Sequence, residues 1–134
     1  AAGQKLGFSQ KDIRLDGHAI ECRINAEDPS EGFRPSCGKI TLLHIPGGPM
    51  VRFDTALYPD YVIPPFYDSM IGKLIVHAGT RQEAIRKMQA ALCEMVIEGV
   101  EINRELQLET IASKEFADGT YTTDFLNRLL KQLY

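Results

Sequence analysis

The alternation of apolar and polar residues is clearest at positions 18–29, where it repeats at every second residue. Successive side chains of a strand point to opposite faces, so one set can pack against a core while the other faces outward. The apolar set is Ile20, Cys22, Ile24 and Ala26, and the polar set is Glu21, Arg23, Asn25 and Glu27. The pattern predicts a strand with a row of hydrogen-bonding side chains, which is typical either of a functional surface or of an ordinary half-exposed strand.

The rest of positions 18–78 is also β-rich and is broken by turn residues. Further strands are expected at 39–44, 51–54, 61–63 and 71–77. Residues 46–49 read Pro-Gly-Gly-Pro, and this turn predicts a hairpin between the strands at 39–44 and 51–54.

The second half of the chain has a helical pattern. Thr80 and Glu83 have the spacing of a capping box, and apolar residues then recur at helical intervals as far as Val96. Gly99 is expected to end this helix. Further helices are predicted at about 104–113 and from about 123 onward.

These elements predict an α+β fold in which helices cover a mostly antiparallel sheet. The length of 134 residues, with 44% hydrophobic and 25% charged residues, fits one globular domain. Within it we expect residues 1–17 to be the tail of a preceding segment and a linker, 18–78 the β-rich part and 80–134 the helical part.

Composition excludes several classes of function. A net charge of −3 without a basic run argues against nucleic acid as a partner, and no apolar run approaches the roughly twenty residues of a membrane span. The three cysteines form no C-x-x-C pair and the three histidines share no ligand spacing, which indicates reduced thiols in a cytoplasmic protein and no metal site. The usual phosphate-binding loops and nucleophile motifs are also missing.

Four motifs follow one another at residues 17–29, 35–41, 46–48 and 62–74. Together with residues 98–106 they resemble the C-terminal domain of biotin carboxylases, and the likeness covers essentially the whole chain. The run Glu-Cys-Arg-Ile-Asn-Ala-Glu-Asp, which begins at Glu21, is more similar to the acetyl-CoA carboxylase type than to the pyruvate carboxylase type.

This resemblance implies an ATP- and bicarbonate-dependent ligase that carboxylates the ureido nitrogen of biotin on its carrier protein, a step of fatty-acid synthesis in acetyl-CoA carboxylase. In the family, the N-terminal and ATP-grasp domains precede this portion, and ATP, Mg and bicarbonate bind mainly there. The implied partners are therefore those two domains and the biotin carboxyl carrier protein. The chain alone is expected to be inactive.

The resemblance assigns both catalysis and biotin binding to Arg23, which matches the family arginine that faces the biotin and bicarbonate pocket. Loss of the N1′ proton of biotin puts negative charge on the ureido oxygen, and a fixed guanidinium stabilises that charge. The other interpretation is a surface ion pair of Arg23 with Glu21 or Glu27, which would contribute little.

Asp68 is the second candidate for biotin binding. It matches the aspartate of the family motif Pro-Pro-Tyr-Tyr-Asp-Ser-Met, with Phe66 in place of the first tyrosine and two prolines, Pro64 and Pro65, that stiffen the approach. The alternative is a turn in which Asp68 caps the next strand. We interpret Lys73, further along the same motif, as structural.

Arg52 matches an arginine of the family's two-fold contact, which implies a homodimer near this residue. Here Pro49 and Met50 stand where the family commonly has Phe-Gly, so an aromatic anchor is missing and the chain alone could be a monomer. Two alternatives stay open. One is a non-catalytic assembly module that docks a partner through the polar strand face and the Gly47-Gly48 turn. The other is the same domain from a carboxylase of pyruvate or propionyl-CoA.

Overall fold

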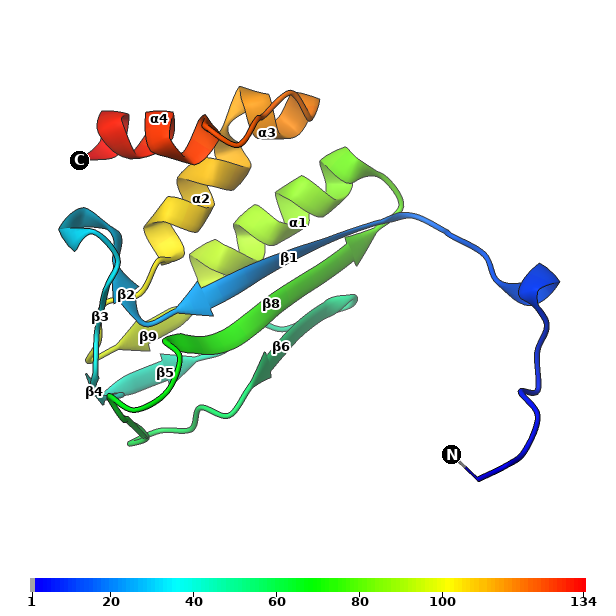
Figure 1. Cartoon of the computed structure of the whole chain (residues 1–134), viewed down its shortest axis with the longest axis horizontal. Helices are drawn as coiled ribbons and strands as arrows, with labels where there is room; N and C mark the ends of the chain where they lie inside the picture. The colour runs from blue at the N-terminus through cyan, green and yellow to red at the C-terminus, as the bar shows by residue number, and fades with distance from the viewer. Residues whose placement is uncertain (1) are drawn as a thin grey trace.

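A computed structural model describes residues 2–134 and confirms the α+β class (Figure 1). Its largest sheet has three antiparallel strands in the order β1-β8-β6. These strands are β1 (His18–Asn25), β6 (Val51–Thr55) and β8 (Met70–Ala78). Before β1, the chain runs away from the sheet and contains the short 3-10 helix η1 (Gln10–Asp12).

The described residues also form three two-stranded sheets. They are β2 (Glu27–Asp28) with β3 (Arg34–Pro35), β4 (Gly38–Lys39) with β7 (Val62–Ile63), and β5 (Leu42–His44) with β9 (Val96–Glu98). The 3-10 helix η2 (Pro29–Glu31) joins β2 to β3.

The predicted hairpin of 39–44 with 51–54 is wrong. The first segment changes partners in its middle, because the Ile40 amide donates to the Tyr61 carbonyl and the Thr41 amide to the Glu98 carbonyl, both at 2.9 Å. The second segment is β6, which pairs with β8 instead. A turn with suitable residues therefore joins strands that pair with other parts of the chain.

Helix α1 (Arg81–Glu94) begins with the expected capping box. The Thr80 hydroxyl accepts from the Glu83 amide at 3.3 Å, and the Glu83 carboxylate accepts from the Thr80 amide at 3.0 Å. The helix ends at Glu94, well before Gly99, because the next residues leave it to form β9. The remaining helices are α2 (Arg104–Ala112), α3 (Lys114–Asp118), which the sequence pattern did not predict, and α4 (Phe125–Leu133).

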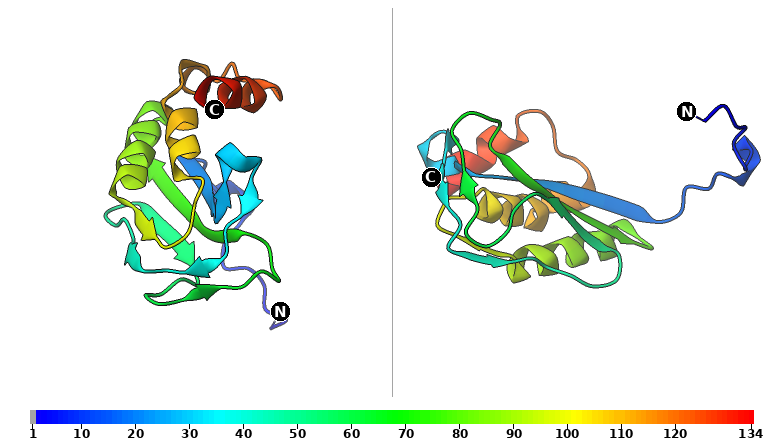
Figure 2. Two further views of the ribbon diagram at one scale, coloured as in Figure 1. Left: turned by 90° about the vertical axis from the view of Figure 1, so that its left-hand side faces the viewer. Right: turned by 90° about the horizontal axis from the view of Figure 1, so that it is seen from below.

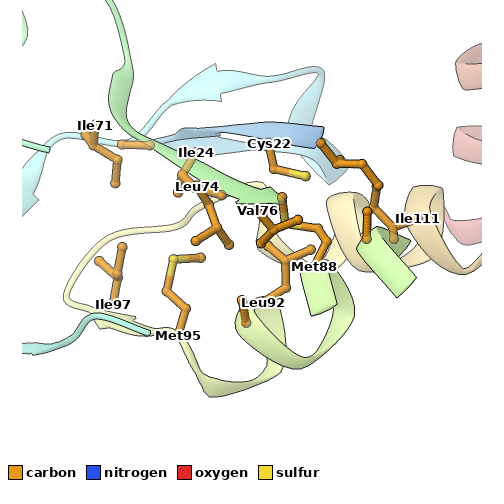
Figure 3. Packing of buried hydrophobic residues seen from close by; sticks show 14 of the residues in the cluster. Cys22, Ile24, Ile71, Leu74, Val76, Met88, Leu92, Met95, Ile97 and Ile111 are labelled. Carbon is orange, nitrogen blue, oxygen red and sulfur yellow. The ribbon is translucent and has the colours of Figure 1, made fainter. Parts of the chain in front are cut away.

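The hydrophobic core lies between α1 and one face of the sheet (Figures 2 and 3). Met88 and Leu92 of α1 are fully buried, as are Ile24, Leu74 and Val76 of β1 and β8. The alternation in β1 thus has the expected result, since its apolar side chains face α1 and the opposite side of the strand is exposed at Glu21 and Arg23.

Candidate functional site

The outward face of the three-stranded sheet brings charged side chains into register. Arg23 of β1 lies opposite Lys73 of β8, and Lys73 in turn lies opposite Asp54 of β6. A row of two cations and one carboxylate therefore crosses the sheet on the side away from α1.

The guanidinium of Arg23 is exposed, and within residues 2–134 its side chain is held by one hydrogen bond, from Nε to the Met70 sulfur at 3.2 Å. Among residues 2–134, no carboxylate forms an ion pair with Arg23. The predicted alternative, a pair with Glu21 or Glu27, is therefore not formed. Thioether sulfur is a weak acceptor, so the planar fork of N–H groups is left available for an anion.

The row of four polar residues predicted for β1 holds only for its first two members. A register shift between Ile24 and Asn25 ends the regular alternation, and Asn25 and Glu27 are half-buried. Glu27 instead accepts from the Asn25 amide group at 3.3 Å and from the Ser69 hydroxyl. Such a bulge redirects the residues that follow it, which the period-two pattern alone cannot show.

Asp68 lies in the loop that leads into β8. Its Oδ1 accepts from the Met70 amide at 2.8 Å, so the predicted turn-capping role is present, and the side chain is exposed. The structure brings Arg23 and Asp68 together on Met70, because one bonds its sulfur and the other its amide. The loop is tied to the end of β1 by Ser69, whose carbonyl accepts from the Ala26 amide at 2.8 Å.

A pocket of about 420 Å³ opens beside Asp68, at the end of β6 and β8. Lys73, which the sequence suggested to be structural, lines this pocket together with Asp54 and Asp68, while Arg23 is not part of its lining. Phe66 and Tyr67, on the same loop as Asp68, are each 84% exposed. Met70 and Ser69 are site residues that the sequence did not single out; the signal available was their place directly after Asp68.

Arg52 lies on β6, and its exposed guanidinium pairs with Asp54 at 2.7 Å. The turn before it contains Met50, which is 66% exposed and has a backbone φ of +59°. Glycine adopts this left-handed conformation most easily, so a methionine here carries backbone strain.

Cys22 and the three histidines, other reactive side chains considered from the sequence, contact neighbouring parts of the fold. Cys22 is buried in the core, and burial raises the pKa of its thiol to about 12, with a smaller contribution from the Glu21 carboxylate. The imidazoles of His18, His44 and His77 contact Arg81, Glu94 and the Asp16 carbonyl respectively.

No cluster of His, Cys, Asp and Glu in residues 2–134 has the arrangement of a metal site. Nor does any helix in this part of the chain have the length and hydropathy to cross a membrane.

Comparison with known proteins identifies the family. The model of the biotin carboxylase C-terminal domain matches residues 21–128. Among curated proteins, Biotin carboxylase 1 of Bacillus subtilis is 49% identical over 94% of this chain and 28% of its own length. One of the pyruvate carboxylase subunits of Methanothermobacter thermautotrophicus is 50% identical over 95% of this chain and 26% of its own length. The chain thus spans about a quarter of the length of these relatives.

Solved structures agree with this result. The biotin carboxylase subunit of a pyruvate carboxylase superposes with a TM-score of 0.93 and 40% identity, covering 99% of this chain and 30% of that one. The biotin carboxylase domain dimer of Hydrogenobacter thermophilus 2-oxoglutarate carboxylase, in complex with MgADP, ADP and bicarbonate, gives a TM-score of 0.91 and 45% identity, with 95% and 28% covered. The chain belongs to the biotin carboxylase C-terminal domain family.

Proposed function

We propose that this domain forms one wall of the active site of a longer biotin carboxylase, which uses ATP and bicarbonate to carboxylate biotin on its carrier protein. The exposed, unpaired guanidinium of Arg23 carries the proposal. It stands on the open face of the sheet and shares Met70 with Asp68 as a hydrogen-bond partner; within residues 2–134 its side chain is held only by the weak sulfur acceptor of Met70.

In this proposal Arg23 is the catalytic residue. Its guanidinium donates hydrogen bonds to the ureido oxygen of biotin, where negative charge grows as the N1′ proton leaves, and it can also orient the anionic carboxyl donor. Asp68 contacts the biotin from the neighbouring loop. Its carboxylate is held by the Met70 amide, so both groups are placed by one residue of β8.

ATP and Mg are proposed to bind mainly in the parts of the enzyme outside this chain, namely its N-terminal and ATP-grasp domains. One observation supports this division: the chain spans about a quarter of the length of its relatives, so most of each relative lies outside the matched region. A solved relative in complex with MgADP and bicarbonate is consistent with these cofactors.

The isolated chain is expected to be inactive. With ATP, Mg, bicarbonate and free biotin it should release no phosphate above background, because the groups that bind the nucleotide are supplied elsewhere. The full-length enzyme that contains this domain should release phosphate and form carboxybiotin under the same conditions. Measurable turnover by the chain alone would contradict the proposed division of the active site.

We further propose which acceptor molecule the whole enzyme carboxylates. The sequence form at residues 21–28 favours acetyl-CoA carboxylase, and hence a cytoplasmic enzyme of fatty-acid synthesis. Relatives of similar identity are named for pyruvate, and a solved relative for 2-oxoglutarate. Assaying the assembled enzyme with acetyl-CoA, propionyl-CoA and pyruvate as acceptors tests this choice, and carboxylation of acetyl-CoA is the expected result.

A second role, homodimer formation, is favoured by the exposed Arg52 and by a solved relative that is a dimer. We expect Arg52→Ala to weaken self-association of the full-length enzyme at least about tenfold, because arginine is often a major contributor to interface energy. Sedimentation equilibrium measures the change, with Arg86→Ala, an exposed arginine on α1, as the matched control. Equal dissociation constants for both variants would exclude the Arg52 surface as the dimer contact.

A further inference from the structure

Asn103 is the one polar or charged side chain in the described part of the chain that is buried, with 6% of its surface exposed. It immediately precedes α2 and lies against the outer edge of β1. A buried amide group is unfavourable unless its donors and acceptor are all satisfied, so its partners show what it holds in place.

Its partners are backbone groups of the strand that carries Arg23. The Asn103 side-chain oxygen accepts from the Asn25 amide at 3.0 Å, and its Nδ2 donates to the Arg23 carbonyl at 3.1 Å. The backbone amide of Asn103 donates to the Asn25 carbonyl, also at 3.1 Å. Gln107, one turn further along α2, donates a second hydrogen bond to the Arg23 carbonyl at 3.2 Å. Asn103 therefore pairs with the free edge of β1 much as another strand would.

These bonds act on the least regular point of β1. The register with β8 shifts between Ile24 and Asn25, and such bulges let a strand bend and turn its side chains. Asn103 bonds both residues next to Ile24 and so fixes the bulge from outside the sheet. Asn25 in turn is the register partner of Met70, whose sulfur is the one hydrogen-bond partner of the Arg23 side chain in residues 2–134.

We propose that Asn103 is a positioning residue for Arg23, which sets the direction of the guanidinium through the backbone of β1. The inference rests on the proposed catalytic role of Arg23. Asn103 is not among the residues that line the pocket beside Asp68, and its side chain bonds the backbone of β1, so we expect its effect on the reaction to pass through the strand.

The test is a double-mutant cycle in the full-length enzyme with Asn103→Ala, Arg23→Ala and the double variant. We expect Asn103→Ala to lower kcat for biotin carboxylation about ten- to a hundredfold, the order expected when a catalytic group is misplaced by about 1 Å. The affinity for ATP, measured by direct binding, should stay within about twofold. In the Arg23→Ala background, the same substitution should have almost no further effect on kcat, because the group that it positions is gone.

A stability control separates positioning from general damage. Leu106→Ala removes a buried α2 side chain without any bond to β1, so it should lower the melting temperature while kcat of the folded enzyme stays near normal. If Asn103→Ala does not yield folded protein, Gln107→Met removes one donor to the Arg23 carbonyl at a half-buried site, with an expected loss in kcat of several fold.

The two proposals fail in different ways. Normal turnover of Arg23→Ala would overturn the proposed function itself. Loss of turnover in Arg23→Ala, combined with an undiminished effect of Asn103→Ala in that background, would overturn only the positioning role. Unchanged kcat in folded Asn103→Ala, or in Gln107→Met where it replaces that variant, would have the same meaning.

Discussion

Replacing Arg23 by alanine in the full-length enzyme is expected to lower kcat for biotin carboxylation about a hundred- to a thousandfold, the usual loss of about 3–4 kcal/mol when a donor to a developing oxyanion is removed. ATP affinity should stay within about twofold, since the nucleotide is proposed to bind outside this domain. The fold should also survive, because the Arg23 side chain is exposed and makes a single weak hydrogen bond within residues 2–134. Steady-state kinetics with biotin, together with nucleotide binding, measure both effects.

A lysine variant at position 23 separates the effect of positive charge from that of the planar guanidinium. Arg23→Lys keeps the positive charge but loses the planar fork of donors, so its kcat should fall nearly as far as that of the alanine variant. Arg34→Ala is the matched control, because it removes an equal charge from an exposed arginine of β3, whose register partner is Asp28 of β2. Wild-type turnover in both Arg23 variants would mean that this face of the sheet is merely solvated.

The strongest local patterns correctly predicted the elements that position the site. The period-two alternation of β1 placed Arg23 outward, and the capping box located the start of α1. Both features depend on residues close together in sequence, and burial of one face is enough to specify them. The family resemblance added Asp68, which the structure places with Arg23 on Met70.

The features that the sequence did not reveal depend on hydrogen bonds and strand pairing between residues that are far apart in the chain. The bulge after Ile24 is held by Asn103, almost eighty residues away, and no local pattern signals that contact. The same holds for residues 38–44, which pair first with β7 and then with β9. Gly99 is a third case: it fits the pattern of a helix stop, yet α1 has already ended at Glu94.

The actual constraint on Gly99 leads to a stability prediction. Its φ is +100°, and an added Cβ would fall on the carbonyl oxygen of Lys39 and lie 3.0 Å from the backbone nitrogen of Thr41. Both are backbone atoms of the segment that crosses from β4 to β5, so no side chain can turn aside to make room. Gly99→Ala should therefore combine left-handed strain with overpacking and lower the free energy of unfolding by about 3 kcal/mol.

Gly119→Ala is the matched control for this prediction. Gly119 also has a positive φ, +70°, at the end of α3, but a Cβ there would meet no atom within 4 Å. It should lose about 1–2 kcal/mol from backbone strain alone, so the difference between the two variants measures the close approach of residues 38–44 to β9. Urea unfolding of both variants gives the comparison. An equal decrease in the free energy of unfolding in both variants would mean that a Cβ at position 99 does not contact the backbone of residues 39–41. The placement of β5 beside β9 would then have to be revised.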